Sequence, residues 1–255
     1  MVERPQQALM TVCRTVAIVQ ARQGSTRLPG KVLMDLGGDT MLSRVVRRAA
    51  RAQTVDELVV ATSSNDQDDA IVAECARLGA TCFRGVELDV LERYYTVATA
   101  THAEVVVRIT ADCPFIDPEV IDTVVRAFHR YAVDYASNTQ QRSWPRGLDV
   151  EVFACAALER AFHEAQLPWQ RTHVTPYFYQ HPELFRLHAV VAAEDYSDFR
   201  WTVDTPEDLA LARAIYQSLE NCDDFSWRAA LAVIAETPEL AELNRRIRQK
   251  SLEDG

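Results

Sequence analysis

The residues best suited to chemistry lie close together near the start of the chain, in the stretch ARQGSTRLPGK at residues 21–31. This stretch combines three cations, Arg22, Arg27 and Lys31, with two glycines and two hydroxyls. Glycines let backbone N–H groups approach an anion closely, hydroxyls donate further hydrogen bonds, and cations neutralise phosphate charge. The stretch therefore predicts a loop that binds a triphosphate, in preference to an ordinary basic surface loop.

The spacing of this loop differs from that of two common nucleotide-binding motifs. Five residues separate Gly24 from Gly30, and Val32 follows Lys31 where a P-loop carries the Ser or Thr that binds magnesium. The sequence contains no G-x-G-x-x-G either, which disfavours a dinucleotide-binding fold. We expect a nucleotide site of a different class.

Two aspartates follow apolar runs further along the chain. Asp112 comes shortly after VVVRIT, and Asp204 comes directly after RWTV. Magnesium prefers oxygen ligands and usually takes one or two protein carboxylates, with water and substrate phosphate in its other positions. Each aspartate has a simpler interpretation, as a turn residue or a helix cap, but Asp117 and Thr205 are better placed for those roles. The pair predicts a magnesium site beside the phosphate loop.

Candidate contacts for a second substrate follow residue 132, where the rhythm of the chain changes. The alternation in LDVEV, residues 148–152, places two acidic side chains on one face of a strand, opposite the apolar face. A solvated strand face and a structural histidine are the simpler alternatives. The candidates are Arg142, Arg146, Asp149, Glu151, His173 and Tyr177.

These groups need a scaffold, and the hydrophobic periodicity supplies one. We expect strands at residues 15–20, 57–62, 82–84, 105–110, 133–137, 148–153 and 200–203, and helices at 41–52, 68–78, 90–100, 118–131, 206–219, 227–236 and 239–250. Such alternation is typical of an α/β fold with a mostly parallel sheet and helices on both faces. Ligands in these folds bind at the carboxyl ends of the strands, where the motifs lie.

The same pattern suggests a domain organisation. We expect a catalytic domain at residues 15–219, with a small acceptor or dimerisation lobe at about 133–195, and a helical extension at 220–255. Residues 1–14 read as a loose arm. In the helix at 41–52, Arg44, Arg47, Arg48 and Arg51 oppose the apolar face, and we interpret them as a solvated surface.

Composition excludes several other classes of protein. The chain has 255 residues and a net charge of -10 without a block rich in Lys or Arg, so nucleic-acid binding is disfavoured. Six cysteines without a C-x-x-C pair indicate reduced, mostly buried thiols. With no long apolar stretch before the first strand, we expect neither a signal peptide nor a membrane span, and a cytoplasmic location.

Four stretches together resemble a known group of enzymes. They are ARQGSTRLPGKVL, ATSSNDQDDAI, FRGVELDVLERY with RITADCPFIDPEVID, and WTVDTPEDL. The chain resembles the spore-coat polysaccharide biosynthesis cytidylyltransferase family, which is similar to the synthetases of CMP-sialate and CMP-ketodeoxyoctonate. The resemblance spans about residues 15–219.

The resemblance implies a Rossmann-like nucleotidyltransferase fold, Mg²⁺ as cofactor and a homodimer. It implies metal ligands at Asp112 and Asp204, and catalytic roles for Lys31, Arg22 and Asp112. The nucleotide site it implies comprises Ala21, Arg22, Gly24, Ser25, Arg27 and Lys31 around the phosphates, and Ala61, Thr62, Ser63, Gly85, Asp89 and Arg93 around the base and ribose.

The expected reaction transfers CMP from CTP to a sugar-like acceptor and releases pyrophosphate, in surface polysaccharide or glycoconjugate biosynthesis. The acceptors that we consider are a nonulosonic acid, a sugar phosphate and a phosphonate. Three alternatives stay open: a guanylyltransferase that uses GTP and a sugar 1-phosphate, a glycosyltransferase that uses a nucleotide sugar, and a nucleotide-binding regulatory module without catalysis.

Overall fold

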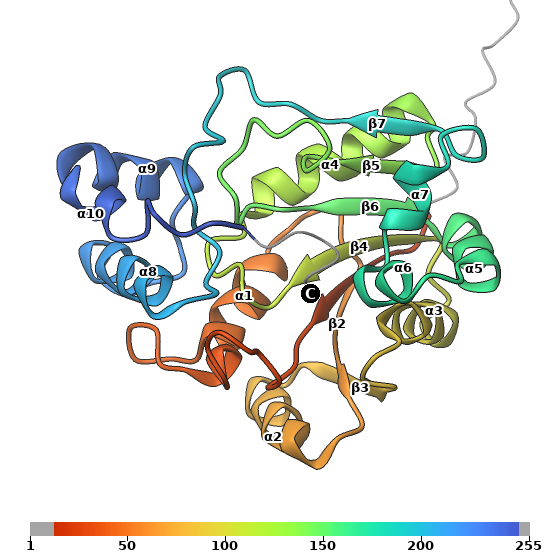
Figure 1. Cartoon of the computed structure of the whole chain (residues 1–255), viewed down its shortest axis with the longest axis horizontal. Helices are drawn as coiled ribbons and strands as arrows, with labels where there is room; N and C mark the ends of the chain where they lie inside the picture. The colour runs from red at the N-terminus through yellow and green to blue at the C-terminus, as the bar shows by residue number, and fades with distance from the viewer. Residues whose placement is uncertain (1–12, 250–255) are drawn as a thin grey trace, which may run out of the picture.

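A single mixed sheet forms the centre of the computed structural model, which describes residues 13–249 (Figure 1). Its strand order is β3-β2-β1-β4-β6-β5-β7. Strands β3, β2, β1 and β4 run parallel, β6 is antiparallel to both β4 and β5, and β7 is parallel to β5. The strands are β1 (Thr15–Gln20), β2 (Glu57–Ser63), β3 (Thr81–Gly85), β4 (Val105–Thr110), β5 (Tyr135–Ser137), β6 (Glu151–Ala154) and β7 (Leu187–Ala189).

Helices cover both faces of this sheet, as the alternation predicts. The helices are α1 (Met41–Ala49), α2 (Asp69–Leu78), α3 (Val90–Ala100), α4 (Pro118–Tyr131), α5 (Cys155–Glu164), α6 (Pro168–His173), α7 (Pro176–Gln180), α8 (Pro206–Ser218), α9 (Trp227–Glu236) and α10 (Glu239–Glu242), with short 3-10 turns η1 (Lys31–Leu33) and η2 (Asp66–Asp68). Side chains of α1, α2, α4, α8 and α9 pack in one core cluster, and those of α3, α5 and α7 pack in another. The mostly parallel α/β sheet and its two helical layers are confirmed.

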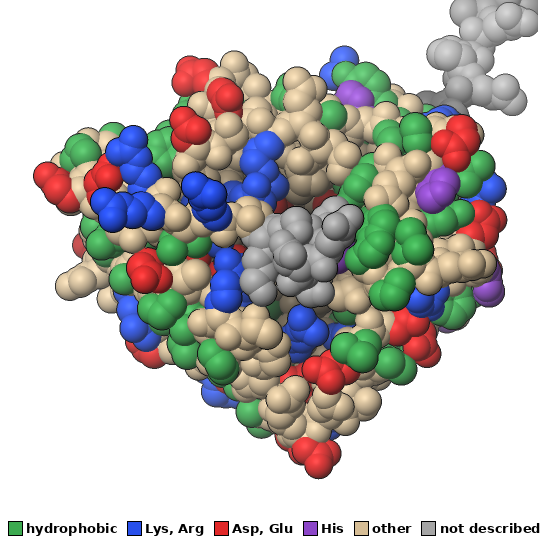
Figure 2. Space-filling model, viewed as in Figure 1, with side chains coloured by type: hydrophobic (Ala, Val, Ile, Leu, Met, Phe, Trp, Pro, Cys, Tyr) green, Lys and Arg blue, Asp and Glu red, His purple; other side chains and the backbone are tan. Residues whose placement is uncertain are grey.

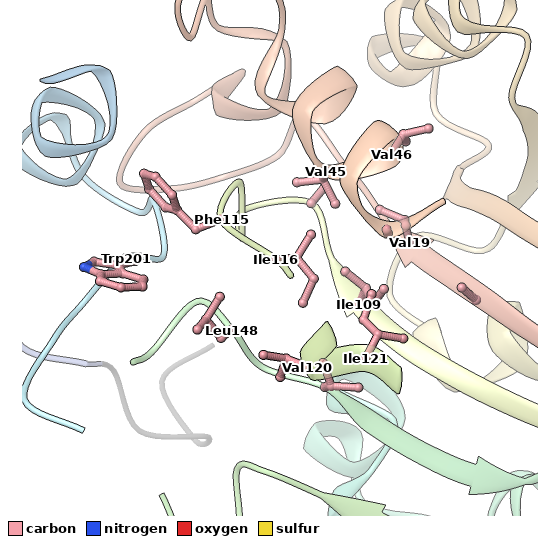
Figure 3. Packing of buried hydrophobic residues seen from close by; sticks show 14 of the residues in the cluster. Val19, Val45, Val46, Ile109, Phe115, Ile116, Val120, Ile121, Leu148 and Trp201 are labelled. Atoms are coloured by element: carbon pink, nitrogen blue, oxygen red, sulfur yellow. The ribbon is translucent and has the colours of Figure 1, made fainter. Parts of the chain in front are cut away.

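Alternation along β1 divides its side chains between the two cores. Ala17 and Val19 join the cluster under α1 and α4, whereas Val16 and Ile18 join the cluster under α3 and α5. Figure 3 shows Val19 and Ile109 on the sheet close to Ile116 and to side chains of α1 and α4. All of these side chains are at least 90% buried, so β1 and β4 are rigid supports for the loops at their carboxyl ends.

Two expected strands are shorter than the sequence pattern suggests, and one is wrong. The expected strand at 133–137 begins at Tyr135, and the one at 148–153 is replaced by β6, which begins at Glu151. Residues 200–203 do not join the ladder. The backbone of Trp201 donates to the carbonyl of Arg146 at 2.6 Å, and that of Val203 to the carbonyl of Asp112 at 2.8 Å. The backbone N–H groups of residues 201 and 203 therefore bond to loops instead of to a neighbouring strand.

Gly147 allows this loop contact to be close. Its φ is 109°, and a Cβ at this position would lie 2.6 Å from the backbone nitrogen of Thr202. A side chain would be excluded both by the left-handed backbone and by this approach. The loop that carries Arg146 is thus fixed against the segment that carries Asp204.

The interpretation of the α1 arginines as a solvated face is wrong for two of them. Arg44 is 4% exposed and Arg48 is fully buried. Arg48 donates from Nε to the carbonyl of Ile116 and from Nη1 to that of Asp223, each at 2.8 Å, and its guanidinium lies over the ring of Phe225. Carbonyls from distant loops replace water around this cation. Arg47 keeps a side chain that is 45% exposed.

Residues 133–195 pack in the same two core clusters as the rest of the sheet. They contribute β5, β6 and β7 to the sheet, with Val152 in one core cluster and Phe153 in the other. Residues beyond 220 also pack on the core, through Trp227, Ala230 and Ile234. The expected helix at 239–250 ends at Glu242, and its last residue lies outside the described part of the chain. Most of the arm expected at 1–14 lies outside it too.

All six cysteines are free, as expected, but only Cys75 and Cys113 are buried. None of the helices within residues 13–249 has the length and apolar character needed to cross a membrane.

Candidate active site

A cavity of about 400 Å³ opens where the carboxyl ends of β1 and β4 lie side by side. Lys and Arg side chains stand around the centre of this face in Figure 2, while Asp and Glu side chains lie mostly toward its edges. The predicted phosphate loop supplies much of the lining, with Ala21, Arg22, Gly24, Ser25, Thr26, Arg27 and Lys31. This loop and the two predicted metal ligands therefore share one cavity.

Lys31 is the point where the predicted groups meet. Its Nζ donates to Asp112 Oδ2 at 2.8 Å, to Asp204 Oδ1 at 2.8 Å and to the carbonyl of Val203 at 2.9 Å. Lys31 is only 8% exposed. Three loops that are far apart in the sequence thus place one cation between two carboxylates.

This arrangement keeps both partners of the Lys31–Asp112 pair charged. Burial alone would raise the pKa of Asp112, but the Lys31 ammonium and the hydrogen bonds from Lys31 and Thr110 lower it to about 2. Burial would lower the pKa of Lys31, but Asp112 and Asp204 raise it above its usual value. The cavity therefore holds fixed charges at neutral pH, and these can orient a charged ligand.

Local hydrogen bonds give the phosphate loop its shape. The backbone of Ala21 donates to the carbonyl of Ala61 at 3.0 Å, which extends the β1–β2 pairing, and that of Gly30 donates to the carbonyl of Gln23 at 3.1 Å. Gly30 has a φ of 72°, the left-handed conformation that glycine adopts without strain. This turn starts η1 and directs Lys31 at the aspartates.

Arg22, Arg27 and Arg93 contribute charge to the cavity in different ways. Arg27 pairs with Asp204 at 2.9 Å. Arg93 is 2% exposed and donates to the carbonyls of Val86 and Glu87. The guanidinium of Arg22 lines the cavity without a hydrogen bond or ion pair to any residue in the described part of the chain. Arg22 is therefore available to an incoming anion.

Five residues expected near the base and ribose lie outside the described lining of the cavity. Ala61, Thr62 and Ser63 are fully buried in β2, and the Ser63 hydroxyl donates to Asp68. Asp89 caps α3 and pairs with Arg171 at 2.6 Å, and Gly85 packs against the side chain of Arg93. Among the described residues, none of these five belongs to the cavity lining.

The acceptor candidates fall into two groups. Arg146, Asp149 and His173 line the cavity, and Arg142 supports Asp149 through two hydrogen bonds of 2.7 and 2.9 Å. Glu151 instead forms a buried ion pair with Arg108 and accepts from Tyr135, and Tyr177 donates to Glu164 at 2.6 Å. Neither Glu151 nor Tyr177 therefore belongs to the described lining of the cavity. Glu151 is buried in β6 and does not lie on a solvated strand face.

Asp68 shows how a polar motif can be structural. Asp66-Gln67-Asp68 has the D-x-D spacing that glycosyltransferases use for a metal. Asp68 is fully buried, however, and its carboxylate accepts from the backbone of Gln23 at 2.8 Å and from the Ser63 backbone and hydroxyl. It ties the phosphate loop to the end of β2.

Sequence reasoning missed Arg200 and Gln249. Arg200 Nη2 donates to Asp204 Oδ2 at 2.7 Å, and Gln249 lines the cavity. A cation four residues before a candidate metal ligand is a signal that was available for Arg200. No comparable signal marks Gln249, because its place depends on how the chain returns from α10.

Asp112 and Asp204 fit a magnesium site by their chemistry. Both approach the same ammonium group of Lys31, so their oxygens already converge on a single positive charge. Within residues 13–249 there is no cluster of three or more His, Cys, Asp and Glu side chains that could hold a metal. A two-carboxylate site completed by substrate phosphate is the type that Mg²⁺ commonly uses.

Comparisons with known proteins identify the family of this chain. A family model described as Cytidylyltransferase matches residues 16–232. The spore coat polysaccharide biosynthesis protein SpsF of Bacillus subtilis is 36% identical over 231 residues, which cover 88% of this chain and 95% of that relative. An uncharacterized protein of Methanocaldococcus jannaschii, MJ1063, is 36% identical over 242 residues, covering 93% and 97%. The structure of a cytidylyltransferase from Leptospira borgpetersenii serovar Hardjo-bovis matches with a TM-score of 0.87 at 29% identity, covering 94% and 100%.

The chain is a nucleotidyltransferase, with a Rossmann-like fold in which the loop at 21–31 meets Asp112 and Asp204 at the carboxyl ends of β1 and β4. Within that class it belongs to the cytidylyltransferase family. The resemblance drawn from the four sequence stretches is confirmed.

Proposed function

We propose that this enzyme transfers CMP from CTP to an anionic, sugar-like acceptor and releases pyrophosphate. The observation that carries the proposal is the convergence of Lys31, Asp112 and Asp204 in a cavity lined by a cationic loop. A triphosphate needs positive charge along its length, and the transfer needs that charge fixed before the reaction begins.

The acceptor oxygen attacks the α-phosphorus in line, a new P–O bond forms, and the bond to the pyrophosphate oxygen breaks. Arg22 and Arg27 bind the phosphates, and the Lys31 ammonium beside them adds positive charge that stabilises the negative charge on the leaving pyrophosphate. Asp112 and Asp204 would hold Mg²⁺, which supplies further charge neutralisation when bound. The rigid ends of β1 and β4 keep these groups in register.

Arg146 favours an acidic acceptor. Its guanidinium lines the cavity and makes no side-chain hydrogen bond with any residue between 13 and 249. Burial lowers the pKa of Arg146, and so does the neighbouring charge of Arg142. A carboxylate, phosphate or phosphonate on the acceptor would relieve this repulsion, while Asp149 and His173 contact its hydroxyls.

Release of pyrophosphate tests the reaction. The enzyme is incubated with Mg²⁺, CTP or GTP, and a panel of nonulosonic acids, sugar phosphates and phosphonates. We expect CTP with one member of the panel to give equal amounts of pyrophosphate and a CMP-linked product, and Asp112→Asn to give neither. Turnover of a nucleotide sugar in place of CTP would contradict the proposal and indicate a glycosyltransferase. Turnover of GTP with a sugar 1-phosphate would keep the mechanism and change the base.

The remaining parts of the proposal concern the setting. We place the enzyme in the cytoplasm, as a homodimer, in a pathway of surface polysaccharide or glycoconjugate synthesis. The relationship to SpsF supports the pathway, and six free thiols suit a reducing compartment.

A further inference from the structure

Arg200 supports Asp204 from the side opposite Lys31. Its Nη2 donates to Asp204 Oδ2 at 2.7 Å, whereas Lys31 bonds Oδ1 of the same carboxylate. Nε and Nη2 also donate to the two carboxylate oxygens of Asp208, at 3.0 and 3.2 Å. The side chain of Arg200 is only 10% exposed, so these contacts fix the guanidinium and, through it, Asp204.

The chain beyond α10 supplies the rest of this support. Asn244 Nδ2 donates to the carbonyl of Arg200 and to Asp208 Oδ1, both at 2.8 Å. Gln249 Oε1 accepts from Arg200 Nη1 at 2.7 Å, and Gln249 itself lines the cavity. With Gln249 bound, each guanidinium nitrogen of Arg200 has a partner.

Burial makes this support more than a surface contact. Asn244 is 4% exposed, and a buried amide costs free energy unless it is hydrogen-bonded. One of its contacts is the backbone carbonyl of Arg200, and the other is Asp208, whose Oδ2 accepts from the backbone of Asp204 at 3.0 Å. A segment that served only to cover the core would need no amide at this position, since an apolar side chain would pack there without that cost.

We infer that residues 244–249 are a working part of the active site, in which Asn244 and Gln249 are positioning residues that hold Arg200 against Asp204. The inference rests on the proposed function for the metal-binding role of Asp204. Groups that orient a metal ligand commonly change metal affinity about 10-fold or more when they are lost.

Lysine resonances can test the positioning without substrate or metal. Lys31 and Lys250 are the two lysines of the chain, so a protein labelled with ¹³C-lysine gives two sets of side-chain signals in an NMR spectrum, which Lys250→Arg assigns. Lys31 Nζ contacts Asp204 directly, so its signals report on that carboxylate. Asp204→Asn defines the shift expected when the carboxylate is lost.

Asn244→Ala should move the Lys31 signals toward their position in Asp204→Asn. Gln249→Ala removes only the hydrogen bond with Arg200 Nη1 and no core packing. It should move the Lys31 signals less, in the same direction. The matched control is Arg245→Ala, because Arg245 lies in the same segment but pairs with Glu242. Lys31 signals that coincide with those of the wild type in both Asn244→Ala and Gln249→Ala would overturn the inference, even if Asn244→Ala lowered the melting temperature.

Mn²⁺ binding, measured by electron paramagnetic resonance, gives a second readout. We expect affinity for Mn²⁺ alone to fall about 10-fold in Asn244→Ala and to stay unchanged in Arg245→Ala. Equal affinity in the wild type and Asn244→Ala would overturn the inference by leaving Asn244 a purely structural role. If the wild type itself bound no Mn²⁺, the proposed metal site would fail, and the Lys31 signals would still decide whether the segment positions Asp204.

Discussion

Lys31 occupies the position where two carboxylates from separate loops converge, and its charge governs their behaviour. In the folded enzyme the pKa of Asp112 is about 2, below the usual 3.8, and that of Lys31 lies above 10.5. A lowered carboxyl pKa stabilises the fold above pH 3.8, and this stabilisation is lost as the pH falls toward 2. A raised lysine pKa stabilises below pH 10.5 and is lost above it. The pair is therefore fully stabilising between about pH 4 and pH 10.

Lys31→Met should remove this stabilisation and leave two carboxylates without their shared cation. We expect the free energy of unfolding at pH 7 to fall by about 3 kcal/mol, the usual cost of breaking a buried ion pair on one side. The difference in unfolding free energy between the variant and the wild type should be smaller at pH 3.5. At that pH Asp112 can take up a proton in the variant, which relieves its unpaired charge, whereas in the wild type Asp112 stays charged beside Lys31. Urea unfolding of both proteins at pH 7 and pH 3.5 measures this difference. An equal difference at the two pH values would contradict the role assigned to Lys31.

Arg22 offers a contrasting case, because it has no described partner to lose. Arg22→Ala should weaken CTP binding in Mg²⁺ about 10-fold, the worth of one charge-assisted hydrogen bond, and leave the melting temperature unchanged. Calorimetric titration with CTP gives the affinity. Arg126→Ala is the control, since Arg126 is exposed on α4. The role assigned to Arg22 would be refuted by wild-type affinity in the variant.

At the scale of elements, α1 connects the loop before α4 to the segment after α8 through Arg48. Arg48→Ala should lower the free energy of unfolding by about 3 kcal/mol, because it leaves the carbonyl of Ile116 without its donor, leaves that of Asp223 with Arg51 alone, and removes the contact with Phe225. Arg47→Ala, on the exposed side of the same helix, should cost less than about 1 kcal/mol. Denaturant unfolding measures the free energy of unfolding of both variants. A similar loss of free energy in the two would show that the burial of Arg48 is unimportant.

Local patterns explain which elements the sequence could predict. The apolar run at β1 and the Asp117-Pro118 start of α4 are complete signals within a few residues, and both elements have the expected bounds. Residues 200–203 show a strand-like pattern, but whether an extended segment joins a sheet depends on its neighbours. Here the neighbours are loops around Arg146 and Asp112.

In the site, too, local patterns could be recognised from the sequence and contacts between distant segments could not. The loop at 21–31 and the two aspartates could be recognised because their residue types have few other uses at strand ends. Arg48 and Glu151 were misinterpreted, since the burial of a charge depends on partners from distant segments, such as Arg108 for Glu151. The contribution of Asn244 and Gln249 could not be predicted, because it depends on the tertiary path of the chain after α10.

At the scale of the whole molecule, segments from the early, middle and late parts of the described chain line one cavity. The phosphate loop follows the first strand, Asp112 follows the central strand β4, and Asp204 with Gln249 comes from the last part of the chain. The sheet gives these segments a common edge, and the two cores keep that edge rigid. In the proposed function, the triphosphate binds over β1 and β4 and the acceptor toward Arg146 and Asp149.

Calorimetric titration of the enzyme with CTP, GTP, UTP and ATP, each with and without Mg²⁺, tests this account most directly. We predict that CTP binds more tightly than the other three, that Mg²⁺ strengthens its binding, and that Asp112→Asn removes the Mg²⁺ dependence. Binding of no triphosphate, or CTP binding that is equally strong in Asp112→Asn with and without Mg²⁺, would contradict the account.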